Sequence, residues 1–523
     1  ENKVTTASVA SVKAGNITAS GATVKGVTAN NINVVDRDGV TSVVVNSVQV
    51  GATSASGAEI GELNIAGVKL SVRNRRIEGS TADIDAGTVK LADGQVDNVK
   101  LNRPVFVVEP SGNYRASADL SIGGGVVGRM DMGQAAAKVV ATSSEIQLND
   151  FTADIFKGRA SGSARIALKQ TGPSHVVTRF DGIDISGPLQ VIAGSPVPLA
   201  GRASGNVDLN FPGTNYKLAS GTLSTQLRAE TGATTADRIP ITGDVVVSAD
   251  RGLFNLQQVN LQTPATTLKA TRQFSFENDS NLQVDLNSTD ASELQAVLIN
   301  SGLLPEAEDQ LNSYGIGLAG QLAFNGNIRG KLSDPEVNGR VSLGSLLVNG
   351  TELGAISATV VTNKDELRIP EGRLAERDGG GIQFSLIAPR TGENNAEVHA
   401  TLDRVNVAAL LAISRFSKNE QVNDTQSEIS GQVNVKGIPK AMSGDANLSF
   451  GQGKLAGEPL QGMVARATFQ GSEVKVESVD VRLVAGHIVG SGTLNTSSQN
   501  FDFQGRAESI QLARLAALAN RPG

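Results

Sequence analysis

Three observations in the amino-acid sequence predict an all-β fold, an elongated curled antiparallel sheet of stacked repeats with one short helix per repeat. Apolar and polar residues alternate in many short stretches, two features recur at a spacing of roughly 110 residues, and helix-like segments are short and regularly placed. A module of a few half-buried strands and one short helix cannot cover its own apolar face. We therefore expect the stacked modules to share one sheet that curls into a trough.

Alternation with a period of two is typical of antiparallel strands that have one apolar and one polar face. The stretch NVDLNF places Val207, Leu209 and Phe211 on one face, and EVKVE does the same with Val474 and Val476. Helical periodicity is nearly absent between such stretches. The sequence therefore predicts one strand after another, joined by short turns.

Turns are predicted where glycine, asparagine and aspartate interrupt this alternation. The candidates are DRDG at 36–39, LADG at 91–94 and FNGN at 324–327. DRDG also has the opening spacing of a calcium-binding loop, but the next residues continue into a strand and no glutamate stands at the twelfth position. A hairpin turn is therefore the preferred interpretation.

Four segments share a common strand frame, beginning at Ser143, Asp250, Lys364 and Gly471. A strand opened by a small residue and glycine recurs in the same frame. We interpret these segments as four modules, the last one partial, preceded by a diverged strand-rich segment of the same sheet. The predicted boundaries are 1–137 for the diverged segment, 138–243, 244–357 and 358–464 for the first three repeats, and 465–523 for the fourth.

Each module carries a short helix-like segment. In VNVAALLAISRF, from Val405, the residues Val407, Leu410 and Leu411 share one helix face, and Asn406 is a candidate N-terminal cap. These segments advance along the chain together with the strand frame, which supports the repeat. The counterparts are IDISGPLQVI from Ile183, TDASELQAVL from Thr289 and IQLARLAAL from Ile510.

Composition excludes several classes of protein. A net charge of −6 and a pI near 5.4 argue against a nucleic-acid-binding protein, and the short basic run RNRR at 73–76 is interpreted as a solvated turn. The absence of cysteine excludes disulfides and thiolate metal sites. No apolar run is long enough for a membrane-spanning helix. The first residue is Glu1, from which we expect that an upstream anchor or signal has been left out.

No pattern of catalytic or metal-binding residues stands out. His175, His399 and His487 are isolated on or beside strands, and only His399 has a carboxylate, Glu397, on the same face. GGGVVG at 123–128 fits a dinucleotide-binding spacing but lacks the strand–helix–strand context, so a glycine-rich turn is preferred. We therefore expect no enzyme, no metal and no cofactor.

The module pattern resembles a known family. Alternating strands with a helix at the module end, joined by phrases such as GRVSLGSLLVNGTELG (339–354) and GDANLSFGQGKLAGEPLQG (444–462), are similar to the AsmA-like superfamily and, within it, to the TamB-like translocation and assembly modules. The resemblance covers most of residues 138–518. It implies a long β-taco in the periplasm of a diderm bacterium, anchored in the inner membrane by segments absent from this chain. It also implies phospholipid transport and an outer-membrane barrel partner of the TamA type.

The residues on the apolar side of the clearest strands are the candidate lining of a lipid groove. Aliphatic side chains offer acyl chains an apolar surface without specific hydrogen bonds, which suits passage better than tight storage. The alternative for each residue is a packed core without a ligand. The candidates are Ile146, Leu148, Val207, Leu209, Phe211, Phe254, Leu256, Leu282, Val284, Leu286, Leu322, Phe324, Val341, Leu343, Leu367, Ile369, Val433, Val435, Val474, Val476, Phe501 and Phe503.

The sequence thus predicts a non-enzymatic periplasmic lipid-transfer bridge that carries phospholipid acyl chains between the inner and outer membranes. A second interpretation is a scaffold for outer-membrane protein assembly by pairing of β-edges. A third is a β-helical surface adhesin. Both the long repeat and the helices count against the adhesin.

Overall fold

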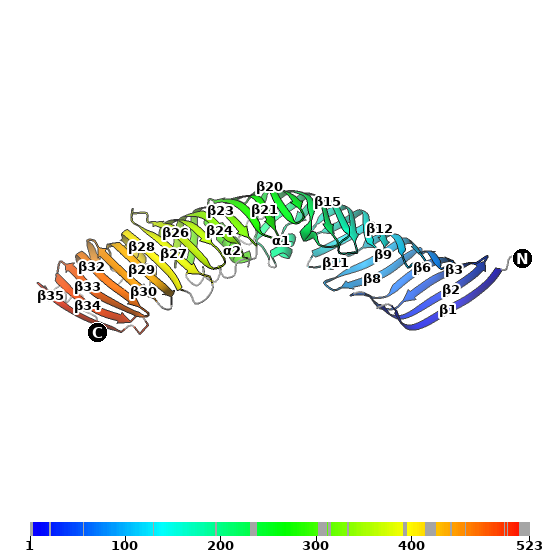
Figure 1. Ribbon diagram of the computed structural model, residues 1–523, viewed down its shortest axis with the longest axis horizontal. Helices are drawn as coiled ribbons and strands as arrows, with labels where there is room; N and C mark the ends of the chain where they lie inside the picture. Colours follow the sequence, from blue (N-terminus) through cyan, green and yellow to red (C-terminus); the bar gives the residue numbers. More distant parts are fainter. Residues whose placement is uncertain are drawn as a thin grey trace. The chain divides into compact units, whose positions relative to one another are not determined.

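The computed structural model confirms the all-β class (Figure 1). The chain divides into two compact units, one of Glu1–Pro264 with Gln273–Glu277 and one of Ala265–Arg272 with Asn278–Gly523. The division falls within the predicted second repeat, whose boundaries stay a prediction. The structure describes residues 4–19, 22–55, 57–128, 130–193, 196–230, 238–301, 311, 315–331, 334–390, 395–413, 425–439, 442–455, 457–495, 497–498 and 500–511.

The first unit is a sheet of mostly long strands, some of which exceed ten residues. Its β21, Thr266–Ser275, crosses the division between the units. The other strands are β1 Val4–Ala19, β2 Ala22–Arg37, β3 Val40–Val50, β4 Thr53–Ala55, β5 Ala58–Ile60, β6 Leu63–Arg73, β7 Arg76–Ser80, β8 Asp83–Leu91, β9 Gly94–Val108, β10 Tyr114–Ile122, β11 Gly124–Val127, β12 Met130–Thr142, β13 Glu145–Ile155, β14 Gly158–Ala167, β15 Pro173–Asp184, β16 Leu199–Pro212, β17 Ser220–Ala229, β18 Ile239–Pro240, β19 Thr242–Asp250 and β20 Leu253–Gln262.

The second unit is a sheet in which most strands pair with the next strand along the chain; β30 pairs with β32, with the short β31 beside it. Its strands are β22 Ser280–Ser288, β23 Ile316–Gly330, β24 Glu336–Val348, β25 Thr351–Thr362, β26 Glu366–Ala375, β27 Gly381–Pro389, β28 Asn395–Asn406, β29 Glu428–Pro439, β30 Ser443–Phe450, β31 Gly453–Leu455, β32 Glu458–Gln470, β33 Glu473–Leu483, β34 Gly486–Asn495 and β35 Phe501–Glu508.

Strand pairing is antiparallel almost throughout, as hairpin connections require. The short β18 is an exception, because it pairs in parallel with the start of β16. In the predicted diverged segment the order is less regular, since β3 pairs with β6 and β7 pairs with β9. The segment nevertheless joins the same sheet, through the pairing of β10 with β12 and of β12 with β13.

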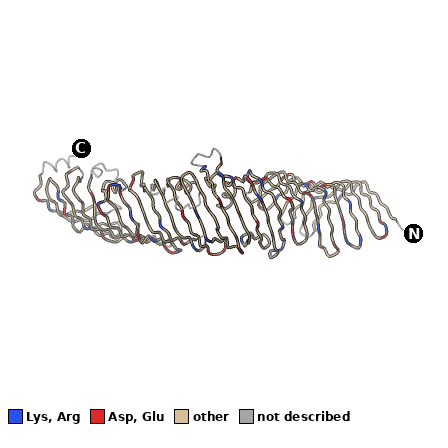
Figure 2. Tube along the Cα trace, turned by 90° about the horizontal axis from the view of Figure 1, so that it is seen from above, with Lys and Arg blue, Asp and Glu red and all other residues tan. Residues whose placement is uncertain are grey.

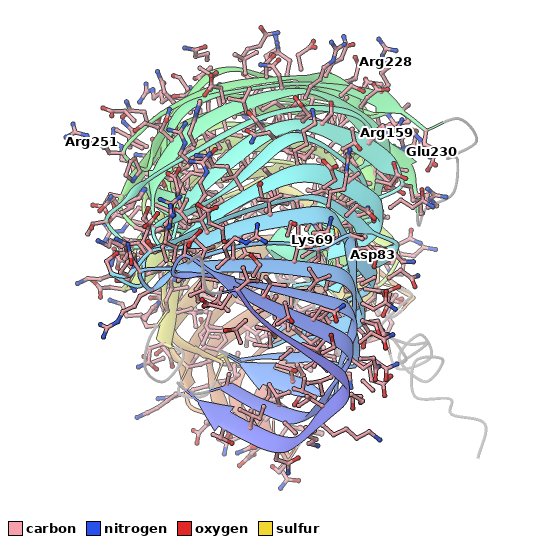
Figure 3. The ribbon with its side chains drawn as sticks, turned by 90° about the vertical axis from the view of Figure 1, so that its right-hand side faces the viewer. Lys69, Asp83, Arg159, Arg228, Glu230 and Arg251 are labelled. Atoms are coloured by element: carbon pink, nitrogen blue, oxygen red, sulfur yellow. The ribbon has the colours of Figure 1, made fainter. Side chains whose placement is uncertain are left out.

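Bulges bend many of the strands. The register shifts by one residue at Asp150 in β13, at Gly182 in β15, at Gly320 in β23 and at Arg404 in β28, and each of these residues has a positive φ. A bulge bends its strand and increases the local twist. Seen end-on in Figure 3, the strands of the first unit are arcs, with the side chains of Arg228 and Arg251 on their outer side.

Three short helices lie at strand ends among the described residues: α1 Ser186–Ala193 after β15, α2 Ala291–Ser301 after β22 and α4 Val407–Ile413 after β28. The helix predicted from Ile510 lies mostly outside the described residues. Two of the helices make similar contacts with the sheet. Helix α1, which follows β15, contacts β12, and helix α4, which follows β28, contacts β25, so each contacts the third strand before the one that it follows.

The predicted cap Asn406 is confirmed, and α2 has a cap of the same kind in Asp290. The Ala408 N–H donates to Asn406 Oδ1 (2.9 Å), and the Ser292 N–H donates to Asp290 Oδ1 (3.0 Å). The side chain of Gln295 in α2 makes two hydrogen bonds with the backbone of β23. Its side-chain amide donates to the Ile316 carbonyl (3.1 Å), and its oxygen accepts from the Leu318 N–H (2.7 Å).

Two of the turn predictions are wrong. FNGN, 324–327, lies inside β23, because its glycine is covered by the phenylalanine ring of its own strand instead of turning the chain. GGGVVG, 123–128, contains β11, which pairs with β9 and β12. DRDG and LADG do form tight turns between paired strands, at the ends of β2 and β8.

Asp184 fixes the start of α1. The side chain is buried and accepts hydrogen bonds from the Ser186 N–H (3.1 Å), the Ser186 hydroxyl (2.6 Å) and Lys157 Nζ (3.2 Å). Burial alone would raise the pKa of this carboxyl. The hydrogen bonds from Ser186 and Lys157 outweigh it, so the pKa lies below its ordinary value.

Asp184→Asn should lower the free energy of unfolding at neutral pH by about 1–3 kcal/mol, because it removes charged hydrogen bonds at a buried site. A lowered folded-state pKa stabilises the fold above the unfolded-state value of about 3.9, and this stabilisation is lost as the pH falls through the folded-state pKa. Urea unfolding followed by circular dichroism should therefore show a difference that shrinks in acid. Asp250→Asn, at an exposed turn, is the control, and a difference that stays the same at acid pH would contradict this account.

Candidate functional site

One face of the sheet in the second unit carries unbroken rows of apolar residues. Each row consists of residues that are direct cross-strand partners, so neighbouring members lie side by side. With roughly 4.8 Å between strands, the longest row extends about 60 Å. From β22 to β35 it contains Leu286, Phe324, Val341, Ala358, Gly372, Phe384, Ala400, Val433, Ala446, Ala467, Val476, Gly492 and Phe503.

A second row lies beside the first, two residues away on each strand except β33, where a bulge makes the separation three. It is apolar except at its first member, Ser288. It contains Ser288, Leu322, Leu343, Ile356, Leu374, Ile382, Leu402, Gly431, Leu448, Ala465, Val479, Gly490 and Gly505. No charged residue interrupts either row.

The first unit has an equivalent face. The cross-strand partners Leu148, Ala164, Val176, Leu209, Gly221, Ala249 and Phe254 form one row. The next row contains Gly162, Thr178, Val207, Leu223, Val247 and Leu256. A single threonine is the only polar member of these two rows.

The structure places all of the predicted groove residues on these apolar faces. In the first unit they are Ile146, Leu148, Val207, Leu209, Phe211, Phe254 and Leu256. In the second, Leu286, Phe324, Val341, Val433, Val476 and Phe503 share the longest row, and Leu322 and Leu343 lie in the row beside it. Val284, Ile369, Val435, Val474 and Phe501 lie directly on its other side, and Leu282 and Leu367 lie further along the strands. Their contact with lipid stays a prediction.

Burial separates these residues into three groups. Leu343 and Val435 are buried, and most others are half-buried. Ile146, Phe501 and Phe503 are exposed, and Phe501 is 78% exposed. The buried pair belongs to the packed core that the sequence left open as an alternative, while the half-buried majority still presents surface to a ligand.

The apolar side chains crowd one another even where no helix covers them. Val45 and Val68, which are cross-strand partners, are 7% and 8% exposed, and Val247 is 6% exposed. On the opposite face, polar residues such as Lys69, the cross-strand partner of Val44, are exposed. Such crowding is expected on the inner side of a bent sheet, where side chains converge.

Phenylalanine rings on this face lie close to glycines of the neighbouring strand. Phe384 is the direct partner of Gly372, and a Cβ on Gly372 would lie 2.5 Å from its ring. Phe180 stands opposite Gly205 in the same way, with 3.0 Å between its ring and the Cβ position. A glycine leaves the room that the ring occupies, so the ring covers the backbone instead of projecting from the sheet.

The pattern recurs along both units. Phe106 is the partner of Gly79, and Phe503 is the partner of Gly492. The Phe324 ring lies over Gly326 and Gly339, which face each other across the strands. Sequence alternation could not have revealed these pairs, because it does not specify which residues of different strands stand opposite each other.

The helices cover one end of the apolar faces. Leu410 and Leu411 of α4 pack against the buried cluster of Leu402, Val405, Val407 and Ile429. Leu189 of α1 packs in the same way against Ile183 and its neighbours. The leucines of α1 and α4 thus pack against the sheet at one end of each apolar face.

An aromatic cluster stands at the edge of the first unit. Phe254 stacks on Phe274 with 4.9 Å between ring centroids, and Phe276 meets both rings edge-on. Phe276 remains 49% exposed. This is a large exposed apolar side chain continuous with the apolar face.

The opposite face is polar and mixed in charge. Lysine, arginine, aspartate and glutamate of both signs are interspersed along the described residues (Figure 2). The histidines lie here as isolated residues, His175 beside Asp208 (2.8 Å) and His487 beside Asp480 (3.1 Å). No group of three or more metal-ligating side chains occurs in the part of the chain that the structure describes.

His399 makes two polar contacts on this face. Nε2 lies 2.9 Å from Glu397 Oε1, and Nδ1 lies 2.9 Å from Asn434 Oδ1. Both partners accept hydrogen bonds, which favours the doubly protonated ring. The contacts with Asn434 and Glu397 therefore raise the pKa of His399 above its ordinary value.

Comparison with known proteins leaves the family open. No protein-family model matches the chain, and no curated protein matches it. Among the described residues, no helix has the length and apolar character needed to cross a bilayer.

Gly372→Ala should force the Phe384 ring away from the backbone and so destabilise the second unit by about 1–3 kcal/mol through overpacking. Replacing the ring in the double variant Gly372→Ala with Phe384→Leu should recover part of that loss, which a double-mutant cycle measures. Gly462→Ala is the control, because its Cβ would meet only one atom, at 3.6 Å. Equal melting temperatures for Gly372→Ala and Gly462→Ala would contradict the proposed ring-over-glycine packing.

Asn434→Ala and Glu397→Gln should each lower the pKa of His399 toward its ordinary value of about 6.5. NMR titration of the imidazole protons measures this directly, with Thr401→Ala on the same strand as the control. Because the folded-state pKa is raised, the histidine stabilises the fold below the unfolded-state value, and that contribution disappears as the pH rises through the folded-state pKa. An unchanged titration in Asn434→Ala would show that the contact has no effect.

Proposed function

We propose that the apolar face binds the acyl chains of phospholipids and lets them pass along the strands' stacking direction. The observation that carries this proposal is the row from Leu286 to Phe503, which contains no polar or charged residue. At about 60 Å it is longer than the roughly 30 Å hydrocarbon core of a bilayer, so several acyl chains fit in succession.

The chemistry of the face favours movement over tight binding. Each buried methylene contributes about 0.8 kcal/mol wherever it lies along the row, so neighbouring positions are nearly equal in free energy. The rows offer no side-chain hydrogen bond that would fix a lipid in one place, apart from Ser288 and Thr178.

The cellular setting of the proposal rests on the resemblance to the AsmA-like superfamily. On that basis the protein is a non-enzymatic bridge in the periplasm of a diderm bacterium, carrying phospholipid between the inner and outer membranes. A barrel protein of the TamA type is the corresponding partner at the outer membrane.

A second candidate function is scaffolding of outer-membrane protein strands by edge pairing. It is favoured by β35, whose residues are all exposed, including Phe501 and Phe503. Among the described residues β35 pairs only with β34. An extended strand can add to such an edge through backbone hydrogen bonds.

Native mass spectrometry of the gently purified chain tests the lipid proposal. We expect co-purifying phospholipid, and Val341→Asp should reduce it at least about tenfold, because a carboxylate on the half-buried apolar face is costly beside acyl chains. Asn338→Asp places the same charge on the polar face of the same strand and should have no effect. Leu343→Asp is unsuitable, since Leu343 is buried and its replacement tests the core.

Two outcomes would contradict the proposal. One is wild-type protein free of phospholipid after gentle isolation. The other is equal lipid content in Val341→Asp and Asn338→Asp when circular dichroism shows both variants folded. Binding of an outer-membrane protein strand peptide in place of lipid would favour the scaffold.

A further inference from the structure

A depression of about 950 Å³ lies on the polar face of the second unit, across β23 to β29. Its two ends are lined by Asn325 and Asn434. Each directly follows a member of the longest apolar row in the sequence, Phe324 and Val433 respectively. Between these ends the lining also includes the row members Val341, Ala358, Gly372, Phe384 and Ala400, each flanked on its own strand by two further lining residues. Because side chains alternate between the two faces of a strand, the flanking residues, such as Arg340 and Ser342 beside Val341, point to the polar face.

A bulge in β26 accounts for the hollow. Between the partners Ile369 with Leu386 and Gly372 with Phe384, the chain of β26 contains Pro370 and an extra residue, Glu371. Proline cannot donate to the neighbouring strand, and a bulge bends and twists the sheet locally. Both bulged residues line the polar depression.

Two arginines dominate the charge of the depression. Arg340 on β24 and Arg373 on β26 are exposed, and neither forms an ion pair within 4.0 Å among the residues that the structure describes. Their strands are separated by β25, and Arg340 pairs with Thr359 whereas Arg373 pairs with Ser357, so their backbones lie roughly 12 Å apart. Glu371 is the one carboxylate in the lining and His399 is paired with Glu397, so the two guanidinium groups give the lining an excess of positive charge.

The remaining lining is composed mainly of amides and hydroxyls. Gln383, Thr401 and their neighbours can each donate and accept hydrogen bonds, as the hydroxyl groups of a sugar do. Phe384 is the one aromatic residue in the lining, and its ring packs against Gly372 of the neighbouring strand. The charge of a ligand must therefore supply much of its affinity.

We infer that the polar depression binds an anionic oligosaccharide, a sugar chain that carries carboxylate or phosphate groups. Arg340 and Arg373 each hold one anionic group, since a guanidinium fork matches both groups bidentately. The amides and hydroxyls between them bind the sugar hydroxyls. The volume is at the upper end for small-molecule sites and exceeds what a single phosphate needs. The inference rests on the polar residues that flank the apolar row and does not depend on the lipid proposal.

Isothermal titration calorimetry with the full chain tests the inference. The probes are tetragalacturonate, pentamannose monophosphate, the neutral maltotetraose, glycerol 3-phosphate and inorganic phosphate. At least one of the two anionic oligosaccharides should bind, more weakly as salt rises, while maltotetraose should not. Glycerol 3-phosphate represents a phospholipid headgroup without a sugar chain, and it should bind at least tenfold more weakly, as should inorganic phosphate.

The variants Arg340→Gln and Arg373→Gln should each weaken binding at least about tenfold, since each removes a charged, bidentate contact. Arg340→Lys keeps the positive charge but cannot make the bidentate contact, so its affinity should lie between that of the wild type and that of the glutamine variants. Arg329→Gln is the matched control, because Arg329 is exposed on the same face of β23 but outside the depression. Thermal melts establish that the variants remain folded.

Three results would overturn the inference. They are the absence of binding by both anionic oligosaccharides, equal binding of maltotetraose, and an equal loss of affinity in Arg329→Gln. Inorganic phosphate or glycerol 3-phosphate binding as tightly as the oligosaccharides would also overturn it, because the site would then recognise the anion alone.

Discussion

The register between neighbouring strands is the constraint on which the rest of the structure depends. A slip of one residue between two strands would turn every apolar side chain of one of them to the polar face. The long row from Leu286 to Phe503 exists because this register is kept from strand to strand in the second unit. The same register sets Arg340 and Arg373 together on the other face, so one constraint produces both surfaces.

Bulges and glycines adapt this register to a bent sheet. A bulge such as that at Arg404 lets a strand bend while its side chains return to the correct face. Gly205 and Gly372 leave the room that the rings of Phe180 and Phe384 occupy against the neighbouring strand. Helices α1 and α4 then pack at one end of each apolar face, where Leu189 and Leu411 extend the core.

Much of this arrangement could be predicted from alternation alone. The period of two in NVDLNF correctly placed Val207 and Leu209 on one face, and the helix spacing correctly predicted Asn406 as a cap. Features that depend on pairs of strands could not be predicted. The glycine of FNGN indicated a turn, but in the structure it lies under the ring of Phe324. The polar depression is formed by residues of seven strands, and no single stretch of the sequence reveals how those strands pair. The two arginines lie 33 positions apart in the sequence and gave no local signal.

The central claim is that one face, and only that face, contacts acyl chains along the strands. Site-specific photo-crosslinking tests it most directly, with a benzophenone side chain placed in turn at Leu209, Val341 and Val433 and, for comparison, at their neighbours Asp208, Ser342 and Gln432. With phospholipid carrying labelled acyl chains, the account predicts crosslinks at the first three positions and none at the second three. Crosslinks of equal yield on both faces, or none at Val341 and Val433 in folded protein, would contradict it.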